Sequence, residues 1–315
     1  MSDTAQLLTD TIDIAPARVR DQSRVRDFVD LLKPRVMSLV VFTGLVGAVI
    51  APVRLHPFEI ALAVLAIALG SGAAGAINMW YERDLDALMT RTRNRPLPTG
   101  RVAPDDALGL GVLLSIFSVL LMALATNFVA AALLTAAILF YVFVYTIWLK
   151  RRTPQNIVIG GAAGAFPPMI GWAAATGDVS AVGIALFGLI FLWTPPHFWA
   201  LALYRSDDYR RAGVPMLPVV AGPRETKRQM LAYTLVLLPV SLVPTLLGAV
   251  GWTYGAVAIV LGLVFVGHAV SVWWADDDAN GHPAARRMFR FSLLYLAVLF
   301  AALPLDKAVM AWIAG

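Results

Sequence analysis

Long apolar runs with few charged residues recur along nearly the whole chain. Each is long enough to cross a hydrocarbon core of about 30 Å, which takes roughly 20 residues of helix. The nine runs are Val36–Val53, Pro57–Trp80, Ala107–Ala125, Phe128–Leu149, Asn156–Thr176, Ala181–Tyr204, Met230–Gly251, Thr253–Ala275 and Phe291–Ile313. Backbone groups in lipid must bond internally, and the runs lack the alternation of barrel strands, so we expect helices. The sequence therefore predicts an all-α polytopic membrane protein with about nine transmembrane helices in a bundle.

The composition agrees with this fold class. The chain is 59% hydrophobic and only 14% charged, far from the usage of a soluble domain. We expect residues 1–26, which lack the apolar core of a secretory signal, to be a mobile cytoplasmic tail, and residues 27–315 to form a single transmembrane domain. The chain has no cysteine, which excludes disulfides, thiolate metal sites and cysteine nucleophiles.

The basic residues predict the orientation in the membrane. If the N-terminus is cytoplasmic, all 25 lysines and arginines fall on the inner side except Arg54 and Lys307. Cytoplasmic loops carry such an excess, so we expect the C-terminus on the outer side of a bacterial inner membrane. The bundle is expected to surround a central cavity that opens to the cytoplasmic side, where the charged loops gather. This signal accounts for the net charge of +5 without a nucleic-acid partner.

Acidic side chains follow the second apolar run where it reaches water. If residues 77–86 continue the helix, Asn78, Glu82 and Asp86 recur once per turn and point to one side. Oxygen ligands on one face suit Mg²⁺, a hard cation that is commonly shared with substrate phosphates. The alternative is a solvated helix end whose acids pair with Arg83 and Arg91.

A second charged loop, residues 204–218, follows the sixth run and echoes the first. Asp207 and Asp208 come just past the helix end, basic residues come next, and prolines close the segment. Two carboxylate clusters that face each other would repel, and bound cations would offset that repulsion. We therefore expect metal ions and a diphosphate between the two loops.

These motifs resemble those of the intramembrane prenyltransferases of the UbiA superfamily, over roughly residues 27 to 312. The family pattern NDxxDxxxD matches Asn78, Met79, Glu82 and Asp86, with methionine and glutamate in place of two aspartates, and its RTxxRP matches Arg91, Thr92, Arg95 and Pro96. The second motif, DxxxD, reads Tyr204-x-x-x-Asp208 and loses its first acid. Residues 150–162, 193–200 and 208–218 are similar to stretches particular to the branch that modifies haem.

The resemblance implies transfer of a farnesyl group from farnesyl diphosphate to a vinyl group of haem b (protohaem IX), which gives haem O for respiratory oxidases. It implies Mg²⁺ as cofactor and haem A synthase or an oxidase assembly protein as partner. The residues assigned to catalysis and to Mg²⁺ are Asn78, Glu82, Asp86 and Asp208, with Asp84, about 200° around the helix from Glu82, as a weaker metal ligand. The diphosphate candidates are Lys33, Arg91, Arg95, Lys150 and Arg151.

His197 lies late in the sixth apolar run, behind two prolines. An ionisable side chain in a membrane span usually faces a cavity or a partner. One interpretation is a contact with haem, since imidazole binds haem iron; the other is a hydrogen bond to a neighbouring helix. A farnesyl cation would also need aromatic walls, for which Trp80, Tyr81 and Tyr145 are candidates.

Two other functions are compatible with parts of the pattern. A prenyltransferase for a quinone precursor or a chlorophyll-type ring would use the same diphosphate site with a different acceptor pocket. A membrane transporter would line a path with polar residues, but here the acids and bases gather at one surface and the central spans carry no charge, unlike an ion relay near the midplane.

Overall fold

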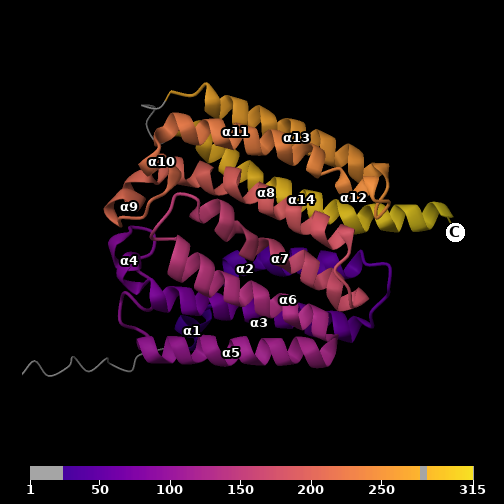
Figure 1. Cartoon of the computed structure of the whole chain (residues 1–315), viewed down its shortest axis with the longest axis horizontal. Coiled ribbons are helices and arrows are strands. Elements are labelled where there is room, and N and C mark those ends of the chain that lie inside the picture. Colours follow the sequence, from indigo (N-terminus) through magenta and orange to yellow (C-terminus); the bar gives the residue numbers. More distant parts are fainter. Residues whose placement is uncertain (1–23, 277–281, 315) are drawn as a thin grey trace, which may run out of the picture.

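The computed structural model describes residues 24–276 and 282–314, and every regular element in these residues is a helix (Figure 1). The elements are α1 (Val25–Leu31), α2 (Pro34–Val49), α3 (Pro57–Tyr81), α4 (Arg83–Leu88), α5 (Pro104–Ala125), α6 (Phe128–Leu139), η1 (Phe140–Leu149), α7 (Asn156–Thr176), α8 (Ala181–Tyr204), α9 (Ser206–Arg211), α10 (Leu217–Val220), α11 (Gly222–Val240), α12 (Val243–Leu246), α13 (Trp252–Trp273) and α14 (Pro283–Ala314). η1 is a π-helix that continues α6. The predicted all-α class is confirmed.

The described residues contain 8 helical spans that are long and apolar enough to cross a membrane. A ninth arises only if α1 and α2 count together across a 55° bend. The predicted first span, Val36–Val53, corresponds to α2, which begins at Pro34, ends at Val49 and has only 16 residues. Pro34 disfavours helical geometry at the residue before it, and Lys33 is left-handed with φ 54° and ψ 53°.

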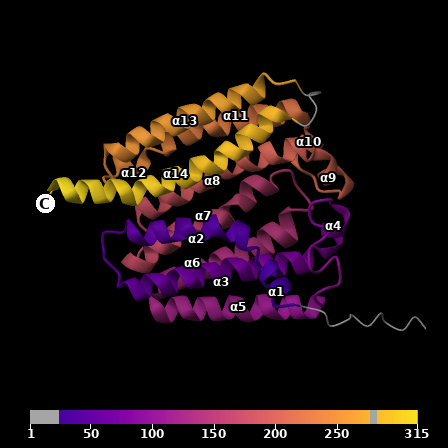
Figure 2. The ribbon, with the colours of Figure 1, turned by 180° about the vertical axis from the view of Figure 1, so that it is seen from behind.

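Two groups of helices can be followed in Figures 1 and 2. One contains α2, α3, α5, α6 and α7, and the other contains α8, α11, α13 and α14. α8 joins the groups because it packs against α7 as well as against α11 and α14. Burial of aromatic side chains such as Trp199, Tyr254 and Phe265 fills the core of the second group.

α2 and α7 approach each other almost to backbone contact. A Cβ atom added to Gly171 would lie 1.9 Å from the backbone oxygen of Gly44, and one added to Gly47 would lie 2.0 Å from that of Pro168. Small residues permit such approach between membrane helices. This contact fixes α2, and with it the segment before α2, against the rest of the first group.

The charged loops gather at one end of the bundle. α4, α9 and α10 occupy this end in both views, whereas the C-terminus of α14 lies at the opposite end (Figures 1 and 2). We call it the loop end. Within the described residues the basic loops group at this end, as predicted. The membrane face on which the loop end lies and the central cavity stay predictions, and the predicted N-terminal tail lies mostly outside the described residues.

Candidate active site

The predicted metal ligands lie where α3 ends. Glu82 leaves helical geometry, with φ −99° and ψ 12°, and the helix restarts as α4 at Arg83, so the run from residue 77 to residue 86 is not one continuous helix. Backbone hydrogen bonds from Glu82 to Asn78 (3.0 Å) and from Asp86 to Glu82 (2.8 Å) carry the helical pattern across the break. The three residues therefore stay on one side, with exposures of 2% for Asn78, 1% for Glu82 and 1% for Asp86.

Lysines from two distant segments bond the first two of these side chains. Lys33 Nζ, between α1 and α2, donates to Asn78 Oδ1 at 2.7 Å. Lys150, just after η1, is ion-paired with Glu82 through Oε2. The other carboxylate oxygen, Oε1, is buried and has no hydrogen-bond partner in the described residues. A buried polar atom without a partner is costly, and it indicates a place for a ligand.

An arginine from the loop after α4 bonds the third side chain. Arg95 donates to Asp86 Oδ2 at 2.7 Å, and Thr92 Oγ1 donates to the Asp86 backbone oxygen at 2.8 Å. Further along the loop, Arg101 Nε donates to Asp27 Oδ1 of α1 at 2.7 Å. The loop is therefore fixed to the buried carboxylate at one end and to α1 at the other.

Thr146, which the sequence analysis did not single out, fixes the amide of Asn78. Its Oγ1 accepts from Asn78 Nδ2 at 3.1 Å and donates to the backbone oxygen of Tyr141 at 2.8 Å. The second bond spans five residues, as in a π-helix. Thr146 in η1 and Lys150 just after it are four residues apart, as are Asn78 and Glu82, so the two polar side chains of this segment meet the end of α3 in the same order. A threonine within an aromatic run gave no sequence signal for this contact.

The second charged loop has the same local structure as the first. Arg205 leaves helical geometry after α8, with φ −123° and ψ 15°, and the 6-residue helix α9 follows, as α4 follows α3. Asp208 is 7% exposed and is ion-paired with Arg211. Arg211 also donates to Thr90 Oγ1, just past α4, at 3.3 Å. α9 therefore lies beside the end of α4.

Three of the predicted residues lie outside the buried group. Asp84 is exposed, and its two oxygens accept from Arg151 at 2.9 and 2.7 Å. The hydrogen bonds from Arg151 hold the pKa of the Asp84 carboxyl below its usual value. Arg91 is exposed as well. Asp84 and Arg151 thus form a surface pair, pointing away from Glu82 as the helical geometry predicts.

His197 also lies apart from the acidic group, between α8 and α14. Its Nδ1 shares a 2.6 Å hydrogen bond with Ser292 Oγ, and its ring stacks on Trp193 and Phe289 at centroid distances of 4.3 and 4.7 Å. The hydrogen bond to a neighbouring helix, one of the two interpretations from sequence, is therefore present. The role of His197 in haem binding stays a prediction.

The oxygens at the end of α3 fit a Mg²⁺ ion that shares its coordination with a substrate. Among the residues that the structure describes, no three His, Asp or Glu side chains come close enough to hold a metal by themselves. Mg²⁺ typically takes one or two protein carboxylates and completes its shell with water and substrate phosphates. Glu82, Asp86 and the amide oxygen of Asn78 would supply such a partial set, and Glu82 Oε1 has no other partner within the described residues.

Known proteins are similar in sequence to this chain over most of its length. Residues 40–304 match the model of the UbiA prenyltransferase family. The chain belongs to this family. It is 57% identical over 296 residues to a protein of Afipia carboxidovorans (94% of this chain and 95% of the relative) and 56% identical to one of Acidiphilium cryptum (98% and 100%). A relative from Brucella anthropi is 55% identical (92% and 93%), and all three are named protoheme IX farnesyltransferase.

Solved structures show the same UbiA fold. A digeranylgeranylglyceryl phosphate synthase superposes with a TM-score of 0.73 at 16% identity, covering 89% of this chain and 97% of its own. A UbiA homologue from Archaeoglobus fulgidus, described as bound to DMAPP and Mg²⁺, gives a TM-score of 0.65 at 18% identity, covering 88% and 99%. The family resemblance seen in the sequence motifs and the prenyltransferase class are confirmed.

Proposed function

We propose that this UbiA-family enzyme transfers a farnesyl group from farnesyl diphosphate to a vinyl group of protohaem IX, giving haem O, with Mg²⁺ as cofactor. The observation that carries the proposal is the buried group at the end of α3, in which oxygen ligands for a hard cation alternate with cationic donors for an anion. The names of the relatives that are 55 to 57% identical support farnesyl as donor and haem as acceptor.

The basic residues of this group bind the diphosphate and stabilise the charge that grows as the bond to the farnesyl carbon breaks. Lysine has three N–H donors and arginine has five, so Lys33, Lys150 and Arg95 can each bond a phosphate oxygen while keeping a protein oxygen. Preorganised donors of this kind lower the barrier because they do not reorient during the reaction. Bound Mg²⁺, held by Asn78 and the carboxylates, would supply Lewis-acid neutralisation of the diphosphate oxygens.

Tyr145 is the best-placed ring to line the path of the farnesyl cation. It packs against Tyr141 at a centroid distance of 5.3 Å, and Lys150 Nζ lies 5.7 Å from its centroid. Trp80 and Tyr81, the other candidates, face arginine side chains toward the loop end. The farnesyl carbon would then bond to the haem vinyl group, and water would supply the hydroxyl of the product with loss of a proton.

The acceptor is expected between α8 and α14, where His197 lies. Replacing His197 with alanine should weaken haem binding and leave binding of a non-reactive farnesyl diphosphate analogue unchanged, because no contact joins His197 to the acidic group within the described residues. Haem absorbance titrations and analogue binding separate the two effects. Unchanged haem affinity would show that His197 is a packing residue.

The test of the function is product formation by the purified protein. Haem b, farnesyl diphosphate and Mg²⁺ are supplied in detergent, and the products are analysed by mass spectrometry with and without EDTA. The proposal predicts a hydroxyethylfarnesyl haem whose formation requires the metal. Transfer to a quinone precursor but not to haem would keep the diphosphate site and discard the haem acceptor.

The orientation is part of the proposal. We place the loop end on the cytoplasmic side of a bacterial inner membrane and the end of α14 outside. In the sequence, all but two of the 25 basic residues fall in the segments that are expected on the cytoplasmic side, where membrane proteins carry such an excess. A partner such as haem A synthase would receive the product there. Cysteine labelling at Arg54→Cys, from the outer side of intact cells only, tests this orientation in a chain without other cysteines.

A further inference from the structure

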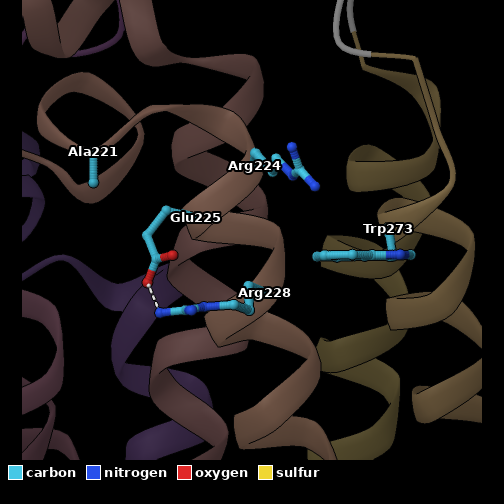
Figure 3. A pocket seen from close by; sticks show the side chains of 5 residues that line it. All are labelled: Ala221, Arg224, Glu225, Arg228 and Trp273. Atoms are coloured by element: carbon cyan, nitrogen blue, oxygen red, sulfur yellow. Dashed lines mark hydrogen bonds and ion pairs between the residues drawn. The ribbon is translucent and has the colours of Figure 1, made fainter.

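A second basic site lies at the loop end, between the start of α11 and the end of α13 (Figure 3). It is a pocket of about 460 Å³ lined by Ala221, Arg224, Glu225, Arg228 and Trp273. None of these residues takes part in the buried group at the end of α3. The proposed transfer reaction therefore gives the pocket no role.

The residues that line the pocket carry a net positive charge, with two arginines against one glutamate. Arg228 donates to Glu225 Oε1 at 2.8 Å, and Gln229 donates to the same oxygen at 2.9 Å. No hydrogen bond or ion pair joins the side chain of Arg224 to the residues that the structure describes, and Figure 3 shows it pointing across the pocket toward α13. Two guanidinium groups against one carboxylate leave the site suited to an anion.

The depth of the pocket matches the headgroup layer of a bilayer. The apolar part of α11 begins at Met230, so at about 1.5 Å per residue Arg228 and Arg224 lie about 3 and 9 Å above it. The interfacial layer on each side of the hydrocarbon core is about 5 to 8 Å thick. Trp273, on the opposite wall, is the residue type that anchors at this level.

An apolar surface continues from the pocket toward the other end of the bundle. On α11 it includes the exposed side chain of Leu235, within about 20° of Arg228 around the helix, and on α13 it includes Val270 and Ile259, within about 60° of Trp273. A soluble anion would not contact this apolar surface, whereas the acyl chains of a lipid pack against exposed apolar helices.

We infer that the pocket between α11 and α13 binds the phosphate headgroup of an anionic phospholipid, whose acyl chains lie along the exposed faces of the two helices. Arg224 and Arg228 bond the phosphate, and Trp273 packs against the glycerol region. Because the site is separate from the diphosphate group, lipid binding persists whether or not the proposed transfer reaction is correct.

The experiment is native mass spectrometry of the delipidated full chain, titrated with phosphatidylglycerol, phosphatidylcholine or inorganic phosphate. We expect tight binding of phosphatidylglycerol only. The Arg224→Gln/Arg228→Gln double variant should bind it about thirtyfold more weakly, equivalent to about 2 kcal/mol for two interfacial cations. Trp273→Ala should weaken binding as well.

Two matched control variants show whether a loss of lipid affinity is specific to the pocket. Arg152→Gln removes an exposed arginine at the same end but outside the pocket, and Trp274→Ala removes the adjacent tryptophan, which is 80% exposed. Both should bind phosphatidylglycerol as the native chain does. The inference is overturned if the double variant binds like the native chain, if the controls lose affinity equally, or if inorganic phosphate binds as tightly as the lipid.

Discussion

Replacing Lys150 with methionine removes the charged partner of a carboxylate that is almost completely buried. The side chain of Glu82 is 1% exposed and that of Lys150 is 16% exposed. Glu82 Oε1 already lacks a partner, so the substitution would leave both oxygens of Glu82 without one. Breaking a buried ion pair from one side typically costs about 3 to 5 kcal/mol. We expect the lower end, about 3 kcal/mol, because Lys33 lies one turn away on Asn78.

The double variant Lys150→Met/Glu82→Gln tests the cause of that loss. With both charges removed no buried ion is left uncompensated, and the double variant should be about 1 to 2 kcal/mol more stable than Lys150→Met, the remaining loss coming from the unpaired amide that replaces the carboxylate. Prenyl transfer should be absent in both variants, because Lys150→Met removes a diphosphate donor and the double variant also loses a carboxylate for the metal. Adding Glu82→Gln to Lys150→Met would thus recover stability but not activity.

The assay is denaturant unfolding in detergent micelles for the native chain, both single variants and the double variant, with product formation measured in parallel. A double-mutant cycle then gives the coupling between the two side chains. The reasoning is refuted if Lys150→Met is as stable as the native chain, or if the double variant is as unstable as the single one.

Three further substitutions test other contacts. Thr146→Val should raise the Mg²⁺ concentration needed for half-maximal transfer about tenfold (about 1.4 kcal/mol), because Asn78 loses a hydrogen-bond partner. Thr146→Ser keeps the hydroxyl and should keep the native Mg²⁺ dependence. Equal Mg²⁺ dependence in the native chain and both variants would contradict this. Gly171→Ala should destabilise the fold by about 1 to 3 kcal/mol, since its Cβ would overlap Gly44; native-like unfolding would show that the helices separate easily. Asp306→Ala should cost about 2 to 4 kcal/mol of unfolding free energy, because it leaves the buried amide of Tyr254 and the partly buried amide of Gly251 unpaired at the start of α13; a smaller change would indicate that water reaches them.

The sequence predicted the acidic side of the site because its spacing is local. Asn78, Glu82 and Asp86 share a face through helical periodicity, and the pattern survives the break at Glu82 because the backbone hydrogen bonds continue across it. Asp84 falls on the other side for the same reason. The family motif supplied Arg95. Lys33 and Lys150, the other two charged members of the buried group, were among the predicted diphosphate candidates as well.

The contacts that orient this group were not visible in the sequence. Thr146 contacts Asn78 from η1, which is wound as a π-helix, and a run of aromatic residues does not reveal this change of register. Asp306 caps the first turn of α13 from a helix far along the chain, so no local capping residue marks that turn. The position of His197 against Ser292 likewise depends on how α8 and α14 pack.

The central claim is that the buried carboxylates at the end of α3 are the working part of the enzyme. The most direct measurement compares haem farnesylation by the native chain, Asp86→Asn and Asp84→Asn, two carboxylates on the same short helix. Asp86 is 1% exposed and bonded to Arg95, whereas the side chain of Asp84 is 61% exposed on the surface. We predict that Asp86→Asn loses transfer but keeps its folding and haem binding, and that Asp84→Asn keeps native transfer. Native transfer in Asp86→Asn, or equal losses in both variants, would contradict it.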